Sequence, residues 1–298
     1  MFSRSLSFLF AGLAVMALLA FIPNKKGEIS PYVDETTKDK MSAFLDMSVE
    51  DALVQLGDEK PRHYIAKADP DSARMGKEMV FDGRLADKSN KRISKYFYCT
   101  DCHNQVLESQ YATDESPEAV LNYSKANDLP FLPASTFYGM YNKRHWYNGD
   151  YFKKYGDLVA PTRDTLENAI QLCAVQCSQG RELESWEIRA IMHYMKSIEY
   201  KIKDLHFAKD EVTQLEKSIS VNNTKAIELL KSKYNDANPA TFGKNEKPVI
   251  EGYQPDSSNG KFIYDNGCLH CHAVEKNMTN FDLGQNKLDF KFLHFLKV

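Results

Sequence analysis

Two copies of one short motif carry the residues in this chain that could do chemistry. Residues 99–103 read Cys-Thr-Asp-Cys-His, and residues 268–272 read Cys-Leu-His-Cys-His. In such a C-x-x-C-H motif the two thiols can form thioethers with the two vinyl groups of one porphyrin, and the histidine can bind its iron from one face. The motifs therefore predict two covalently attached haems of the c type. The predicted attachment residues are Cys99, Cys102 and His103 for the first haem and Cys268, Cys271 and His272 for the second.

Zinc binding and disulfide formation are the alternatives for these cysteines. Both alternatives leave the histidine that ends each motif without a role, whereas covalent haem attachment uses all three residues of the motif. Each motif also follows a stretch of helical pattern that carries a glycine and an aromatic residue, as in small cytochromes c. We therefore predict a dihaem c-type cytochrome that carries out electron transfer.

The composition is typical of a globular protein. The chain has 298 residues, 43% hydrophobic and 27% charged, and this length has room for two domains of ordinary size. The formal net charge is -3 and no basic stripe is present, so we expect no nucleic-acid partner. Four of the 6 cysteines belong to the motifs, which leaves one further pair, Cys173 and Cys177.

Residues 1–26 have the pattern of a targeting segment. Arg4 precedes an apolar run over residues 8–23, and Lys25 and Lys26 follow it. Because the run is shorter than the roughly 20 residues that span a bilayer, we expect either a cleaved signal peptide or a short N-terminal anchor. Both place the rest of the chain in the periplasm, where c-type haem is assembled in bacteria. The protein would then be soluble after cleavage or tethered to the inner membrane.

Two polar stretches are predicted to connect the functional parts. Residues 27–68 form a lead-in with a short helix over residues 48–56, and residues 201–257 form a helical connector. Within the connector, apolar residues recur at helical spacing over residues 209–219 and 225–234. We assign no chemistry to either stretch.

The first haem domain is predicted over residues 69–200. It opens with a helix over residues 71–81 that carries Gly76. In small cytochromes c, such a glycine lets the C-terminal helix of the domain cross at close range, because it has no side chain in the way. We predict this crossing partner as a helix over residues 186–200, capped by Ser185. Its predicted buried face consists of Ile188, Ile191, Met192, Met195 and Ile198.

Between the first motif and this closing helix, residues 131–155 are dense in aromatic side chains. We interpret them as packing around the haem, since a porphyrin needs apolar walls. The alternative is the rim of a substrate site, because Lys143, Arg144 and His145 lie within the cluster and could attract an anion. His145 is also an alternative iron ligand.

The sixth ligand of the first haem is the central question for function. In small cytochromes c it comes from the segment before the closing helix, where this chain has no methionine. Leu166, Ala169, Ile170 and Cys173 recur there at helical spacing, so Cys173 should point inward. As a thiolate it would lower the potential of the haem. Alternatively, Cys173 is a small buried hydrophobe or forms a disulfide with Cys177, which is geometrically awkward within one helix. The other candidate ligands are Cys177, His193 and Met140.

Residues 170–183 read Ile-Gln-Leu-Cys-Ala-Val-Gln-Cys-Ser-Gln-Gly-Arg-Glu-Leu and resemble a segment of the dihaem thiosulfate dehydrogenases. That family's pattern has an isoleucine, a ligand cysteine three residues later, then Gly-Arg-x-Leu and a closing helix. The A subunit of the sulfur-oxidation cytochrome complex also uses a cysteine-ligated haem. The resemblance implies that Cys173 is the iron ligand and that Arg181 is the arginine of the pattern. It further implies that thiosulfate and tetrathionate interconvert at the first haem. The chain differs from the pattern at Cys177, where serine is usual, and at Glu182, where proline is usual.

The second haem domain is predicted over residues 258–298. Gly260, an aromatic residue and the second motif follow one another more compactly than in the first domain. The sequence ends 26 residues after His272 (298 minus 272), which is short for a ligand loop and a closing helix. We expect either that the second domain is truncated, which we favour, or that its iron has no sixth ligand from the protein.

The sequence thus predicts a mostly α fold made of tandem cytochrome c-like domains, the second of them incomplete. Two functions are open within this class. In the first, the protein is an oxidoreductase acting on small sulfur anions, with Cys173 and Arg181 at the active site. In the second, it is a periplasmic electron carrier or cytochrome subunit with no substrate of its own. Both need a redox partner protein, either a cytochrome or a quinone-linked complex.

Overall fold

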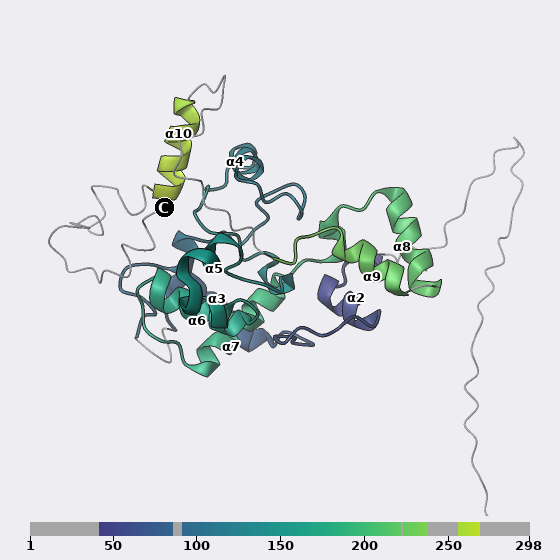
Figure 1. The fold of residues 1–298 in the computed structure, drawn as a ribbon, viewed down its shortest axis with the longest axis horizontal. Coiled ribbons are helices and arrows are strands. Elements are labelled where there is room, and N and C mark those ends of the chain that lie inside the picture. Colours follow the sequence, from purple (N-terminus) through teal and green to yellow (C-terminus); the bar gives the residue numbers. More distant parts are fainter. Residues whose placement is uncertain (1–41, 86–90, 222, 238–255, 269–298) are drawn as a thin grey trace, which may run out of the picture. The chain divides into compact units, whose positions relative to one another are not determined.

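The computed structural model describes residues 42–85, 91–221, 223–237 and 256–268 (Figure 1). The elements discussed below belong to the unit Ala43–Val298. Helices joined by loops make up these residues, and no β-strand occurs among them, so the predicted mostly α fold is confirmed for the described part. The predicted targeting segment lies outside the described residues. No helix within those four ranges is both long and apolar enough to cross a membrane.

The helix that precedes the first motif is α3 (Pro70–Asp82), close to the predicted residues 71–81. Its start is fixed by Asp69, whose side chain accepts a hydrogen bond from the backbone N–H of Ser72 at 2.8 Å. Pro70 stands in the first turn, where a missing N–H is tolerated. The helix ends at Gly83, which adopts a left-handed backbone conformation (φ 66°) that glycine allows without strain.

The predicted closing helix is present as α7 (Ser185–Ser197), but it begins one residue earlier and ends three residues earlier than the predicted range 186–200. Ser185 is the first helical residue rather than the cap, because Glu184 takes that place and its backbone N–H donates to the Glu187 carboxylate at 2.8 Å. The helix stops before Ile198, whose carbonyl accepts the N–H of Gly139 at 3.0 Å and so joins another segment. The predicted buried face of this helix is confirmed. Ile191, Met192 and Met195 are buried, and Ile188 and Ile198 pack against the same core.

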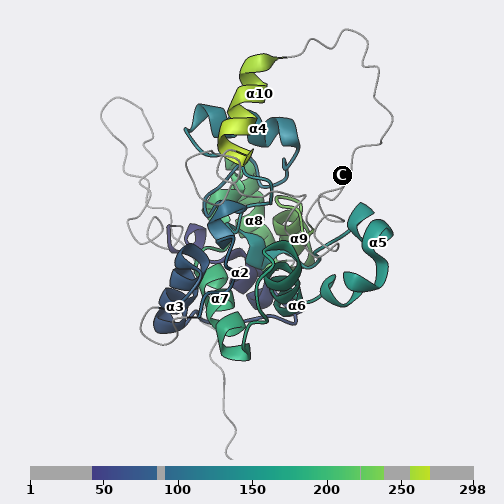
Figure 2. The ribbon, with the colours of Figure 1, turned by 90° about the vertical axis from the view of Figure 1, so that its left-hand side faces the viewer.

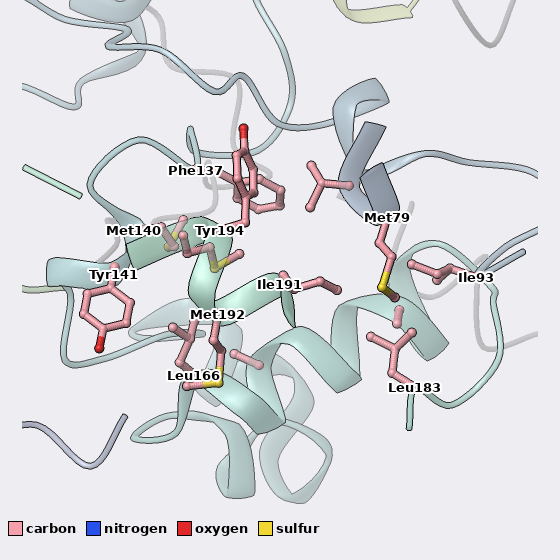
Figure 3. Packing of buried hydrophobic residues seen from close by; sticks show 14 of the residues in the cluster. Met79, Ile93, Phe137, Met140, Tyr141, Leu166, Leu183, Ile191, Met192 and Tyr194 are labelled. Carbon is pink, nitrogen blue, oxygen red and sulfur yellow. The ribbon is translucent and has the colours of Figure 1, made fainter. Parts of the chain in front are cut away.

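The crossing of α3 and α7 depends on Gly76. A Cβ atom built onto this glycine would overlap the carbonyl oxygen of Ala190 in the backbone of α7, so only glycine lets the two helices approach this closely. The two helices lie side by side in both views of the ribbon (Figures 1 and 2). Met79 from α3 and Ile191 from α7 belong to the core around this contact (Figure 3). The crossing that the sequence predicted at Gly76 is therefore confirmed.

A second hydrophobic core joins the two stretches that the sequence analysis treated as connectors. It combines α2 (Val49–Gln55) with α8 (Lys209–Val221) and α9 (Asn223–Lys231). All three helices were predicted, with ends that differ by a few residues. Tyr200, which follows the closing helix, is buried in the same core, so the lead-in, the connector and the end of the first predicted domain pack together.

The other helical elements in the described residues are short. They are η1 (Cys99–Asp101), α4 (Pro117–Ala126), η2 (Met140–Asn142), α5 (Asp150–Tyr155), η3 (Gly156–Leu158), η4 (Ala160–Thr162), α6 (Leu166–Leu172), the π-helical turn η5 (Cys173–Cys177), η6 (Ile202–Leu205), α10 (Ser257–Ile263) and the π-helical turn η7 (Tyr264–Cys268).

Buried charges connect the closing helix to α2. The Lys196 ammonium, almost fully buried, contacts Asp51 at 2.9 Å and Glu199 at 2.7 Å. One carboxylate oxygen of Glu199 is buried without a hydrogen-bond partner. Burial raises the pKa of Glu199 to about 7, although Lys196 opposes that rise.

We expect Gly76→Ala to lower the free energy of unfolding by about 2–3 kcal/mol, because the added methyl group displaces the α7 backbone. Chemical denaturation followed by far-ultraviolet circular dichroism measures this. The matched control is Lys77→Ala, the next and exposed position of the same helix, which should change stability by less than about 0.5 kcal/mol. Equal effects of the two substitutions would contradict the close crossing.

We also expect a pH dependence of stability that Glu199→Gln removes. Because burial raises the pKa of Glu199 from 4.5 to about 7, the folded state binds this proton more tightly than the unfolded chain. Its contribution to stability is therefore full below pH 4.5 and declines until about pH 7. Unfolding measured from pH 4.5 to pH 8 should show a flatter profile for Glu199→Gln than for the exposed control Glu228→Gln. Parallel profiles would show that Glu199 titrates normally.

Candidate haem-binding site

The first motif is held as one tight turn. Cys99 begins the 3-10 turn η1, and the N–H of His103 donates to the carbonyl of Cys99 at 3.0 Å. Asp101 fixes the start of this turn by accepting the N–H of Tyr98 at 2.8 Å. Cys99 and Cys102 are both partly buried free thiols, and burial raises the pKa of Cys99 to about 11. The turn thus brings together the two thiols and the imidazole that covalent haem attachment needs.

His103 is oriented as an iron-ligating histidine would be. Its Nδ1 lies 2.7 Å from the carbonyl oxygen of Ser135, so this nitrogen carries the proton and donates, which leaves the lone pair on Nε2. Metal-bound histidines characteristically donate their other ring N–H in this way. The ring stacks on Phe137 with centroids 4.3 Å apart, and burial lowers the pKa of His103 to about 4. A neutral imidazole is the form that binds a metal.

The segment that supplies this carbonyl runs beside the motif. The N–H of Ala134 donates to the carbonyl of Cys102 at 3.0 Å, and the N–H of Phe137 donates to the carbonyl of Asn104 at 2.8 Å. The sequence analysis missed Ser135, because its contribution is a backbone carbonyl and any residue type could supply it.

The pair Cys173 and Cys177 lies in the π-helical turn η5, which continues α6. The N–H of Ser178 donates to the carbonyl of Cys173 at 2.9 Å, a spacing of five residues that widens the helix locally. π-turns of this kind occur frequently at functional sites. The side chains of the two cysteines interact with each other, and both cysteines are free thiols in this structure.

The two thiols of this turn face different neighbours. Contact with Cys177, then burial, then the nearby thiols of Cys99 and Cys102 raise the pKa of Cys173. Contact with Cys173, and more weakly with Tyr147, lowers the pKa of Cys177 against the effect of burial. Cys173 is therefore the member of the pair whose pKa the motif thiols affect, and Cys177 is the member beside Tyr147.

Three tyrosines at helical spacing cover the outer side of this cysteine pair. Tyr147 places its hydroxyl 4.0 Å from the Sγ atom of Cys177. The ring centroids of Tyr147 and Tyr151 are 5.7 Å apart, and those of Tyr151 and Tyr155 are 6.2 Å apart. Burial, then the Cys177 thiol, raises the pKa values of Tyr151 and Tyr155. Part of the aromatic segment 131–155 thus lines the cysteine pair, and Phe137 lines the motif.

The other candidate ligands are engaged elsewhere. The Nδ1 atom of His193 accepts the N–H of Asp69 at the start of α3, at 3.0 Å. His145 forms a 2.6 Å contact with Asp164 at an exposed position. Met140 is buried in the first hydrophobic core. The thiols of Cys99 and Cys102 affect the pKa of Cys173.

Arg181 is bound to the protein through all of its side-chain N–H groups. Its two terminal nitrogens contact the two carboxylate oxygens of Glu187 at 2.6 and 2.5 Å, and they also donate to the carbonyls of Glu182 and Lys91. The Nε atom donates to the carbonyl of Arg92 at 3.2 Å. Arg181 therefore has no N–H group left for an anion, and its geometry is that of a clamp on residues 91–92.

Further hydrogen bonds that involve the backbone join the same two segments of the chain. The N–H of Arg181 donates to the carbonyl of Ile93 at 2.9 Å, and the hydroxyl of Ser94 donates to the carbonyl of Ser178 at 2.5 Å. A Cβ on Gly180 would overlap the carbonyl of Ile93. These contacts tie the chain that leads into the first motif to the loop that follows Cys177.

The basic residues that could attract an anion within the aromatic segment are also paired. The buried Lys143 contacts Glu115 at 2.7 Å, and Arg144 contacts the fully buried Glu50 at 2.8 Å. Together with the His145–Asp164 contact, these pairs engage all three residues that were candidates for attracting an anion. The geometry therefore favours the packing interpretation of this segment over the substrate rim.

The second motif is described only at its start. The helix α10 leads into η7, which ends at Cys268. Cys271 and His272 lie outside the described residues, as does nearly all of the chain after Cys268. The second attachment site therefore stays a prediction from the sequence.

Within the described ranges, no three side chains among histidine, cysteine, aspartate and glutamate gather as a metal-binding group. No protein-family model matches this chain, and neither a curated protein nor a solved structure was found to be similar to it.

We expect Arg181→Lys to act on stability rather than on any substrate. A lysine cannot make the two-point contact with Glu187 and also reach the carbonyls of residues 91–92, so the free energy of unfolding should fall by about 2 kcal/mol. Denaturant unfolding measures this, with Arg189→Lys on the exposed face of α7 as the matched control. Glu187→Gln should cost a similar amount, and the double variant little more than either alone. Additive losses would show that Arg181 and Glu187 act separately.

Proposed function

We propose that this protein is a periplasmic dihaem c-type cytochrome that carries out electron transfer. The observation that carries the proposal is the arrangement of the first motif. Two free thiols and a neutral histidine share one turn, and the Ser135 carbonyl directs the unprotonated Nε2 of His103 away from its own hydrogen bond. A haem held there would supply reversible one-electron reduction of its iron. The second haem is proposed from Cys268, Cys271 and His272 in the sequence alone.

Cys173 is our proposed sixth ligand of the first haem. Its thiol interacts with Cys99 and Cys102, it lies in a locally widened helical turn, and it forms no disulfide. Iron would favour the thiolate form, because a thiol that coordinates a metal is deprotonated. The protein's own part is to keep this thiol buried.

The narrower function is the oxidation or reduction of small sulfur anions, which the resemblance at residues 170–183 suggests. The pairing of Arg181 with Glu187 argues that this arginine positions the chain instead of holding an anion. Lys143, Arg144 and His145 are likewise paired with carboxylates. These pairings favour electron transfer to a cytochrome or a quinone-linked complex as the function, with sulfur-anion chemistry as the second candidate.

The test is spectroscopy of the full chain, expressed in bacteria that mature c-type cytochromes. The wild-type protein should contain two haems by the pyridine haemochrome assay. The double variant that combines Cys99→Ser and Cys102→Ser should contain one. Low-temperature electron paramagnetic resonance and near-infrared magnetic circular dichroism should show a thiolate signature in the oxidised wild type. Cys173→Ala should lose it, and Met140→Leu should keep it.

Each result decides a different part of the proposal. Absence of covalent haem would overturn the cytochrome assignment. Methionine or bis-histidine signals that Cys173→Ala leaves unchanged would overturn Cys173 as the ligand and with it the case for sulfur-anion chemistry. A thiolate signature together with turnover of thiosulfate or tetrathionate would make the protein an oxidoreductase, and the same signature without turnover an electron carrier.

A further inference from the structure

Cys177 stands between the proposed iron ligand and a strained tyrosine. The side chains of Cys173 and Cys177 are hydrogen-bonded within the π-turn η5, and the Tyr147 hydroxyl is 4.0 Å from the Sγ atom of Cys177. The thiols of Cys99 and Cys102 affect the pKa of Cys173. Cys173, Cys177 and Tyr147 thus form a row of neighbouring side chains.

The backbone at Tyr147 supports a positioning role for this row. Its φ angle is 53°, in the left-handed region that bulky residues rarely adopt. Such a conformation costs about 1–3 kcal/mol and persists where the surroundings impose it, often at functional sites. Here the N–H of the preceding residue, Trp146, donates to the carbonyl of Arg163 at 2.8 Å, and the Tyr147 ring packs against the first core. These contacts hold the hydroxyl toward Cys177.

The Cys177 thiol and the Tyr147 hydroxyl can each donate a hydrogen bond in the direction of Cys173. A thiol is a weak donor and a weak acceptor, and a phenol is a donor and an acceptor. If Cys173 binds iron as a thiolate, the Cys177 S–H group can donate to it while the Tyr147 hydroxyl donates to the Cys177 sulfur. Hydrogen bonds in series polarise one another, and they are stronger in a buried environment than in water.

We propose that Cys177 and Tyr147 are positioning residues that orient the Cys173 thiolate and raise the reduction potential of the first haem. This inference rests on the proposed function, because it requires Cys173 as the ligand. A thiolate ligand donates electron density to iron and thereby favours the oxidised state. A hydrogen bond to the ligand sulfur draws some of that density away, which is one of the means by which proteins tune haem.

The experiment is a redox titration of the holoprotein, with the variants Cys177→Ala, Cys177→Ser and Tyr147→Phe. Cys177→Ala should lower the ratio of reduced to oxidised first haem by up to about tenfold at a fixed potential, which is about 59 mV for one electron. Cys177→Ser keeps a donor at the same place and should recover most of the wild-type potential. Tyr147→Phe should shift the potential in the same direction as Cys177→Ala by a smaller amount.

The matched control is Tyr200→Phe, which removes a buried tyrosine hydroxyl in the second core and should leave the potential unchanged. Haem content and the thiolate signature are measured on every variant, so that loss of haem is not mistaken for a shifted potential. A wild type without a thiolate signature would overturn Cys173 ligation itself. A thiolate signature with equal potentials in wild type and Cys177→Ala would overturn this inference alone. Mass spectrometry that finds a Cys173–Cys177 disulfide in the holoprotein would also overturn it.

Discussion

The close contact of α3 and α7 at Gly76 is the constraint on which the first hydrophobic core depends. Only the absence of a side chain lets the α7 backbone at Ala190 reach α3, and the buried residues of both helices gather around this point. The chain leaves α3 at Gly83, whose carbonyl accepts the N–H of Ile93 at 2.7 Å just before the motif. The path into the haem motif thus starts from the crossing. A small shift of α7 would consequently move the motif and the cysteine pair together.

Arg181 provides a second set of contacts between the loop after Cys177 and the chain before Cys99. An ion pair that is partly withdrawn from water loses part of its attraction to the lost hydration of the two charges, so much of the effect of replacing Arg181 comes from the partners left without it. Its geometric effect is larger, because a planar guanidinium in contact with Glu187 and the carbonyls of Lys91 and Arg92 admits few arrangements. The arginine therefore fixes how the loop after Cys177 lies against the chain before Cys99. This accounts for an arginine at this position without any anionic substrate.

Local patterns in the sequence predicted what depends on local physics. Helical spacing of apolar residues located α3, α7, α8 and α9, and the lack of a side chain at Gly76 indicated the crossing. The three residues of the first motif lie within five consecutive positions, so the sequence alone predicts that they are neighbours. The C-terminal end of α7 was missed because the carbonyl of Ile198 has a partner far along the chain, the N–H of Gly139.

Features that depend on distant partners were outside the reach of the sequence. The Ser135 carbonyl that orients His103 is a backbone atom 32 residues away, and no side-chain type marks it. The partners of Arg181 and Arg144 could not be read from charge alone, so both looked available to an anion. The second core was missed for the same reason, since α2 and α9 each show an ordinary amphipathic pattern and only their pairing makes a core.

The π-turn, a local irregularity of the helix, gives Cys173 and Cys177 different surroundings. In a regular α-helix, residues four apart lie on one face, and both thiols would compete for the same surroundings. The π-turn shifts the helix after Cys173, as the five-residue hydrogen bond from Ser178 shows. The motif thiols then affect the pKa of Cys173, and Cys177 contacts Cys173 and Tyr147. The two thiols therefore have different surroundings, and our proposal gives them different roles: Cys173 as the iron ligand and Cys177 as its hydrogen-bond donor.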